Sequence, residues 1–265
     1  MNKQIVANEN ATVKRKSGTD TEERELEGDG VTEMGNVLET LTCAYDESET
    51  LALDIDDRLS YRQGWPLLPI FPVATITESV PARFSDSSTH MHVFRDLLKA
   101  AKVTTHDILI AHRVNPSIPL SKNTLTLCVL SDEANNKHWI QGIEKLRKYI
   151  QKNDLTLAVE IVDRRAFHGI YTHPLLETDK RIMRMVSRKR RAILDVVRGA
   201  DMPFNKVYFY MRGLSRTRSE CEPTVIIGTP VPNRRVWWEV VIPEIERIVG
   251  GKMDVEVVFE KREDC

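Results

Sequence analysis

The sequence has few of the features that identify an exported, metal-binding or membrane-spanning protein. Its four cysteines lie far apart and none forms a CxxC pair, so neither a disulfide framework nor a zinc site is indicated. No stretch approaches the roughly 18 apolar residues of a membrane helix, and the N-terminus has no apolar core of signal-peptide length. We therefore expect an intracellular protein, cytoplasmic or nuclear, with no membrane partner.

Charge is unevenly distributed along the chain, although the formal net charge is only −1. Residues 1–60 carry 15 acidic and 6 basic side chains, a net of −9, whereas the remainder carries a net of +8. We predict that residues 1–60 form an acidic, mostly disordered arm with a short amphipathic helix near residues 33–42. Three interpretations of the arm remain open: it faces a partner, it folds over a basic surface, or it is only solvated.

The second half of the chain shows the same order of elements twice. Each copy reads helix, strand, strand, helix, strand, and a unit repeated in this way must bury its apolar face against a neighbour. The helices around Trp139 and Trp238 place these two tryptophans at matching positions, which core packing explains. Trp237 differs, because two adjacent helical residues cannot face inward equally, so one of the pair is expected to cover a groove or an interface.

These patterns divide the chain into four segments and predict an α/β protein of the α+β kind. With a preceding strand, each copy has the order of a ferredoxin-like split βαβ unit, with helices packed on one face of one or two mixed sheets. A doubly wound sheet is the competing architecture. The segments are the arm (1–60), a proline-rich linker (61–84), repeat 1 (85–165) and repeat 2 (166–262).

A further indication comes from the second copy, where Pro223–Ile227 is followed by Trp238, then Ile242–Ile245, then Val255–Phe259. This arrangement resembles a pattern in uncharacterised two-repeat α/β proteins of filamentous fungi. The resemblance covers roughly residues 65–262, and the first copy matches it more loosely. The residues that carry the resemblance are packing residues, so it implies no activity and no catalytic residue.

The densest polar cluster follows the predicted strand 157–162. His168 or His173 is a candidate general base, with Asp163 or Asp179 as the group that orients it. Loops at the carboxyl ends of strands are where α/β proteins place such sites. The alternative is a surface crossover with ordinary caps and ion pairs, because no spacing here matches a catalytic motif.

Arginines form two candidate anion-binding clusters. Arg164 and Arg165 follow the same strand, and guanidinium groups hold carboxylates and phosphates well. The second cluster lies in a loop with Gly, Ser and Thr, which suits phosphate, although a solvated loop is the alternative. Neither GxxxxGK[ST] nor GxGxxG is present, so no cofactor is predicted. The members of the second cluster are Arg212, Arg216 and Arg218.

The helix 179–199 is rich in Arg and Lys, including the run Arg188–Arg191. The run suggests nucleic-acid binding or nuclear import, but the apolar stripe of this helix favours a packed helix with a basic outer face. His90 and His92 have the spacing of a metal-ligand pair, yet a third ligand such as His106 or His112 would have to converge on them, so no metal is predicted.

Taken together, these patterns predict a binding or interaction module rather than an enzyme. The expected contact is an anionic ligand or an acidic protein partner, made through the arginine clusters. The alternatives are an accessory metabolic enzyme that uses His168 or His173 with Asp163, and nucleic-acid binding through helix 179–199.

Overall fold

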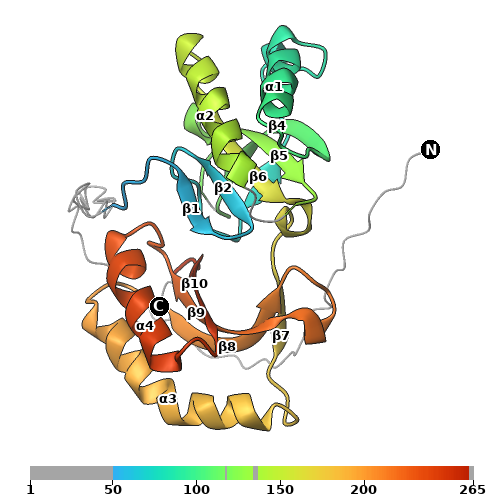
Figure 1. Ribbon diagram of the computed structural model, residues 1–265. Coiled ribbons are helices and arrows are strands. Elements are labelled where there is room, and N and C mark those ends of the chain that lie inside the picture. Colours follow the sequence, from blue (N-terminus) through green and yellow to red (C-terminus); the bar gives the residue numbers. More distant parts are fainter. Residues whose placement is uncertain (1–49, 117, 134–136, 263–265) are drawn as a thin grey trace, which may run out of the picture. The chain divides into compact units, whose positions relative to one another are not determined.

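The computed structural model describes residues 50–116, 118–133 and 137–262, so the predicted helix near residues 33–42 and most of the acidic arm lie outside it. The described residues belong to one compact unit and form two mixed sheets, each with two helices on one face (Figure 1). The predicted α+β class is therefore confirmed. None of the described helices is long and apolar enough to cross a membrane.

The first sheet has six strands in the order β1-β2-β6-β5-β4-β3. Its only parallel pair is β5–β6, which α2 connects, and all other neighbours run antiparallel. The elements are β1 (Asp56–Leu59), β2 (Arg62–Trp65), β3 (Ala74–Ile76), α1 (Thr89–Ala100), β4 (Asp107–Val114), β5 (Leu125–Ser131), α2 (Lys137–Lys152) and β6 (Ala158–Asp163).

The core of this sheet follows from period-two alternation in the strands. Leu127 and Val129 point to the helical face, where they pack with Trp139 and Leu146 of α2. Ser88 caps the start of α1, because its Oγ accepts a hydrogen bond from the backbone N–H of Met91 at 3.3 Å.

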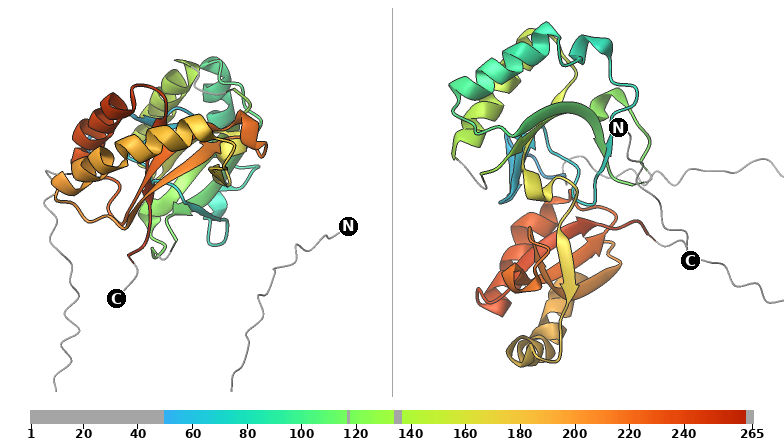
Figure 2. Two further views of the ribbon diagram at one scale, coloured as in Figure 1. Left: turned by 90° about the horizontal axis from the view of Figure 1, so that it is seen from below. Right: turned by 90° about the vertical axis from the view of Figure 1, so that its right-hand side faces the viewer.

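The second sheet has four strands in the order β10-β9-β8-β7, and its helices again cover one face (Figure 2). Here too only the last pair, β9–β10, is parallel. Gly250 adopts φ 64° and ends α4. The elements are β7 (Tyr171–Pro174), α3 (Lys180–Gly199), β8 (Lys206–Gly213), β9 (Glu222–Thr229), a π-helical turn (Trp237–Val241), α4 (Ile242–Val249) and β10 (Asp254–Phe259).

The strand order corrects the ferredoxin-like prediction. In a split βαβ unit another strand lies between the two strands of the crossover, whereas β5 and β6, like β9 and β10, are direct neighbours. The order of elements along a chain does not determine the order of strands in a sheet, which explains the error. The competing doubly wound sheet does not occur in the described residues either, since helices cover one face of each sheet and each has one parallel pair.

Two predicted boundaries also change. Segment 61–84, predicted as a linker, supplies β2 and β3, while the proline-dense stretch 66–73 and residues 77–81 are irregular. The loop predicted at 163–179 contains β7, an edge strand that pairs with β8. Both errors have one cause: β2, which lies between β1 and β6, and the edge strand β7 are short, polar strands that lack the apolar runs of the central strands.

The tryptophan that enters the core of the second sheet is Trp237, not Trp238. The sequence predicts a core position for Trp238, but the core side chains are Trp237, Val241, Ile245 and Val249. The step from Trp237 to Val249 covers twelve residues in three turns, which is more per turn than the 3.6 residues of an α-helix. The π-helical turn, which has more residues per turn, supplies the difference.

Trp238 consequently stays half-buried at the border of that core, as expected for one member of the pair. It lies against the cluster of Leu59, Ile70 and Phe71 from the first half of the chain. The guanidinium of Arg58 stacks on its ring at 4.9 Å and donates to Asn233 Oδ1 at 2.8 Å. Trp238 therefore covers the surface where the two sheets of the unit meet.

Candidate functional site

Asp163, a carboxylate predicted to orient the histidine base, lies at the end of β6 and is buried. Its carboxylate accepts hydrogen bonds from the backbone N–H of Arg165 at 2.8 Å and from Arg165 Nε and Nη2 at 3.0 and 2.7 Å. The hydrogen bond that Arg165 donates to Asp163 raises the pKa of Arg165. Asp163 thus caps the short 3-10 helix Arg164–Ala166 and holds an arginine, and its oxygens are not directed at a histidine.

The two candidate histidines lie apart from this carboxylate. His168 is exposed, and its ring packs edge-on against Phe167 at 5.0 Å. His173 is half-buried in β7, and its Nε2 is enclosed without a hydrogen-bond partner in the described part of the chain. No hydrogen bond joins either ring to Asp163 or Asp179 among these residues, so the predicted acid–base pair is not assembled.

The predicted anion-binding arginines already have protein partners. Arg164 Nε contacts Asp132 at 2.8 Å, and Arg212 Nε contacts Glu256 at 2.7 Å. Arg218 pairs with Asp179, and Arg216 donates to the Tyr171 hydroxyl at 2.8 Å. These pairs bring the segments 163–179 and 212–220 together, because Arg212, Arg216 and Arg218 all bind residues from β7 or the loop after it. The arginines tie β7 to the sheet.

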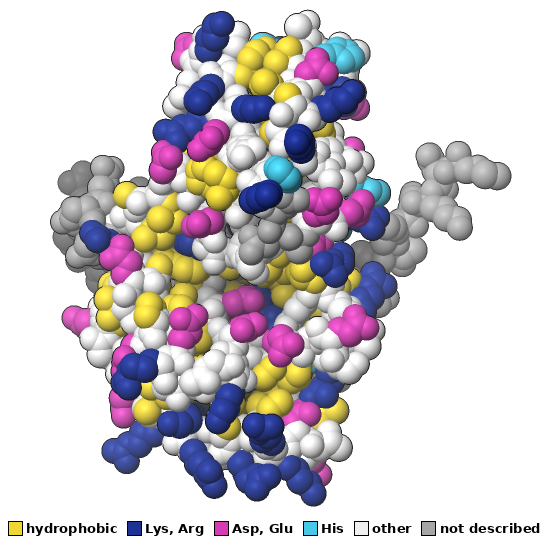
Figure 3. Space-filling model, in the orientation of Figure 1, with side chains coloured by type: hydrophobic (Ala, Val, Ile, Leu, Met, Phe, Trp, Pro, Cys, Tyr) yellow, Lys and Arg dark blue, Asp and Glu magenta, His cyan; other side chains and the backbone are white. Residues whose placement is uncertain are grey.

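Cationic side chains without such partners gather on α3. Residues 180–191 include seven Lys or Arg and no acid, and all seven are exposed. Within the described ranges none of the seven forms an ion pair, and the only hydrogen bond from a side chain of this group runs from Arg184 Nε to the carbonyl of Lys180 at 3.1 Å. Dark blue side chains line the lower edge of the molecule over α3 (Figure 3). The members are Lys180, Arg181, Arg184, Arg188, Lys189, Arg190 and Arg191.

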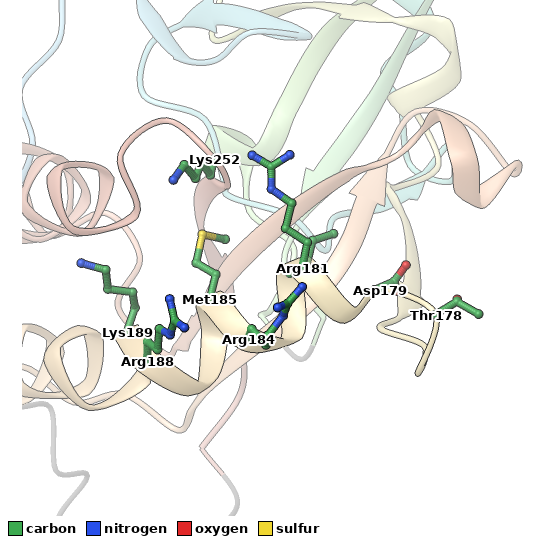
Figure 4. Close-up of a pocket in the computed structure, with 9 residues that line it drawn as sticks. Thr178, Asp179, Arg181, Arg184, Met185, Arg188, Lys189 and Lys252 are labelled. Carbon is green, nitrogen blue, oxygen red and sulfur yellow. The ribbon is translucent and has the colours of Figure 1, made fainter.

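A groove of about 670 Å³ runs along this helix, and we call it the α3 groove. Arg181, Arg188 and Lys189 reach from α3, and Lys252 reaches from the loop between α4 and β10 on the other side (Figure 4). Between them lie the apolar side chains of Ile182 and Met185, both half-buried. The groove therefore has basic walls and an apolar floor.

The acid that borders the α3 groove does not neutralise it. Asp179 pairs with Arg218, and its Oδ2 also accepts the backbone N–H of Leu176 at 2.7 Å. Its charge is thus directed away from the helix, toward the loop before β9. The groove keeps an excess of positive charge that can attract an anion.

The sequence interpretation missed a buried ionic cluster on the helix-free face of the first sheet. Glu160 is fully buried and accepts from Arg62 Nε at 2.6 Å and from Arg113 Nε and Nη2 at 2.7 and 2.9 Å. Burial alone would raise the pKa of Glu160, but the charges of Arg62 and Arg113 and their hydrogen bonds outweigh it and lower the pKa to about 2. A glutamate amid the apolar run 157–162 was the available signal.

Aromatic rings enclose this cluster. The Arg113 guanidinium lies over the Phe167 ring at 4.7 Å and that of Arg62 over Phe71 at 5.0 Å. Burial and the charge of Glu160 raise the pKa of the neighbouring Cys128 thiol. Such a thiol stays protonated and unreactive near neutral pH.

The histidines considered as metal ligands have other roles. His90 Nδ1 lies 2.9 Å from the Tyr149 hydroxyl, and its ring contacts Phe84 and Phe94. His106 pairs with Asp132 at 3.3 Å, and His112 Nδ1 lies 2.8 Å from Thr124 Oγ1. Over the described ranges, no three metal-ligating side chains come together.

Comparison with known proteins adds no further constraint. No family model matches the chain, and neither a curated protein nor a solved structure is significantly similar to it.

Proposed function

We propose that the protein is a binding module whose α3 groove holds an acidic segment of a partner protein. The observation that carries the proposal is the excess of cationic side chains along α3 and at Lys252 with no acid paired to them among the described residues. A protein surface normally intersperses charges of both signs, so a long field of one sign favours an oppositely charged partner. The binding role is the one expected from the sequence, but at α3 instead of the paired arginines.

The floor of the groove favours a peptide over other polyanions. Ile182 and Met185 present apolar surface between the cationic walls. An acidic peptide with an aliphatic or aromatic side chain would bury that side chain on the floor and place its carboxylates on the walls. Methionine adapts its shape to such a side chain readily.

Nucleic acid is the second candidate, favoured by one observation. Lys180, Arg184, Arg188 and Arg191 recur at three- and four-residue intervals, which aligns them along one side of α3. A straight row of cations can follow a phosphate backbone. This candidate leaves the apolar floor without a role.

An enzyme is less well supported. The candidate histidine base and its carboxylate do not contact each other, and Asp163 binds Arg165 instead.

We also propose that the two halves derive from one duplicated unit, because β3 to β6 and β7 to β10 share strand order and strand directions.

A direct experiment compares three labelled probes by fluorescence anisotropy: a peptide of alternating Glu and Leu, a poly-Glu peptide of equal length, and a short DNA duplex. We expect the Glu–Leu peptide to bind most tightly. The double variant Arg181→Glu/Arg188→Glu should weaken it at least about tenfold, since two attractive contacts become repulsive. Arg198→Glu, on the same helix but outside the groove, is the matched control.

Further variants separate the walls from the floor. Met185→Ser should abolish the preference for the Glu–Leu peptide over poly-Glu while leaving poly-Glu affinity unchanged. Tightest binding of the duplex would transfer the proposal to nucleic acid. If no probe binds at low salt, or if Arg198→Glu weakens binding as much as the double variant, the α3 groove is not the binding site.

A further inference from the structure

A second groove, of about 620 Å³, lies at the edge of the first sheet and is independent of α3. His112 of β4 and Leu125 of β5, which face each other across the strand pair, form its buried part. Pro81 and Arg83, from the turn before α1, and Leu120, from the loop before β5, form the exposed part. We call it the His112 groove.

His112 reaches this position through the alternation of β4. Ile108 and Ile110 point into the core beneath the helices, and His112 is the next residue on the same face. It lies beyond the apolar core cluster, only 7% exposed. An imidazole at the end of an apolar row, beside an open groove, has one nitrogen to anchor it and one to offer.

Hydrogen bonds determine which nitrogen of His112 carries the proton. The Thr124 hydroxyl has one hydrogen, which it donates to the carbonyl of Ser121 at 2.7 Å. With that hydrogen on Ser121, Thr124 Oγ1 acts as an acceptor, for His112 Nδ1 at 2.8 Å and for the backbone N–H of Ser121 at 3.3 Å. In the neutral ring Nε2 is then a hydrogen-bond acceptor. No described residue binds Nε2, which is not among the enclosed polar atoms, so it remains open to the groove.

Arg83 supplies the second polar group. Its side chain is exposed, and its guanidinium lies over the Phe84 ring at 4.9 Å. No carboxylate of the described residues pairs with it. Stacking on Phe84 restricts the guanidinium while leaving its N–H donors available for an anion.

We propose that the His112 groove binds a small organic acid that has an apolar body and a hydroxyl group. The carboxylate binds Arg83, the hydroxyl donates to His112 Nε2, and the apolar body lies on Leu120, Pro81 and Leu125. The arrangement is that of ligand sites in general: mostly apolar walls with a few polar groups that fix orientation. The site does not depend on the function proposed for α3.

The test uses 3- and 4-hydroxyphenylacetate as probes, with phenylacetate and 4-hydroxyphenethyl alcohol as analogues that lack the hydroxyl or the carboxylate. Binding is followed by NMR titration of the full chain. We expect one hydroxyphenylacetate isomer to bind at least about tenfold more tightly than either analogue, because a hydrogen bond to a charged group or from a bound hydroxyl is worth about that factor. Resonances of β4 and of residues 79–83 should shift.

Three variants assign the contacts. Arg83→Ala should lower the affinity for the hydroxyphenylacetate and for phenylacetate about tenfold. His112→Asn keeps a donor toward Thr124, but its shorter side chain places no acceptor where Nε2 lies, so it should lower the affinity of the hydroxy acid to that of phenylacetate. Arg95→Ala, an arginine outside the groove, should change nothing. Because Arg83 is exposed, its variant tests the site even if His112→Asn misfolds.

Several results would overturn the proposal. They are equal affinity for all four probes, no saturable binding, shifts confined to other parts of the chain, or unchanged affinity in Arg83→Ala. A long-range proton–nitrogen spectrum that places the His112 proton on Nε2 would also remove the acceptor on which the proposal depends.

Discussion

Arg113 on β4 and Glu160 on β6 form a two-point ion pair across the intervening strand β5, with both side chains completely removed from solvent. Arg62 on β2 completes the cluster from the other side of β6. The three residues lie on β2, β6 and β4, and Cys128 of the intervening β5 lies against Glu160. The cluster therefore connects four of the six strands of the first sheet. Their separation in sequence makes the cluster a long-range constraint on the sheet.

The first prediction concerns the stability of this cluster. Glu160→Gln should lower the free energy of unfolding by about 3–5 kcal/mol, because it leaves two buried guanidinium groups without a counter-charge. Urea unfolding followed by circular dichroism measures the loss. Glu244→Gln, in the exposed pair with Arg247, is the control and should have little effect. Equal stability of Glu160→Gln and wild type would show that the cluster is unimportant.

The second prediction concerns acid. The pKa of Glu160 is about 2 in the folded protein, below its ordinary value of 4.5, so between these values the unfolded chain binds the extra proton. The stabilising contribution of Glu160 is therefore complete above about pH 5 and is lost as the pH falls toward 2. Unfolding midpoints measured from pH 7 to 2 should fall more steeply for wild type than for Glu160→Gln. Parallel curves would contradict the assignment.

The third prediction separates the two adjacent tryptophans. Trp237→Ala should cost about 3–5 kcal/mol, because it empties a fully buried site in the core of the second sheet. Trp238→Ala should cost less, about 1–3 kcal/mol, since this side chain is half-buried against Arg58. The two unfolding curves decide the ranking. A larger loss for Trp238 would mean that the α-helical spacing, not the π-helical turn, describes the core.

The fourth prediction concerns thiol chemistry. Cys128 is fully buried and its pKa is raised by burial and by Glu160, so it should resist alkylation by iodoacetamide in the folded protein. Peptide mass spectrometry after brief labelling should find it unmodified in native protein and fully modified in urea. Rapid native labelling would indicate frequent opening of the sheet near β5.

Sequence patterns located the long elements well and the short ones poorly. The strands at β5, β6 and β9 and the helices α2 and α3 carry enough apolar residues to specify both type and facing. The hairpin β1–β2 and the edge strand β7 do not, because their stability comes from pairing with strands remote in sequence, such as β2 with β6.

A candidate site could be predicted from the sequence only where its interacting residues are close together in the chain. Clustering of cations on α3 is visible in the sequence, because a helix brings residues four apart together. The neutralisation of Arg212 by Glu256, 44 residues later, is not. The same holds for Glu160, whose partners lie 98 and 47 residues earlier, and for the proton on His112, which depends on a loop hydroxyl.

The widened turn at Trp237–Val241 makes this helix unusually intolerant of a change in chain length. Deleting one residue there would restore α-helical geometry. The Trp237 side chain would then rotate toward Arg58, and the Trp238 side chain would rotate into the core of the second sheet. A surface loop absorbs the loss of a residue locally. Here the core of the second sheet and the cluster around Leu59, Ile70 and Phe71 would both have to repack.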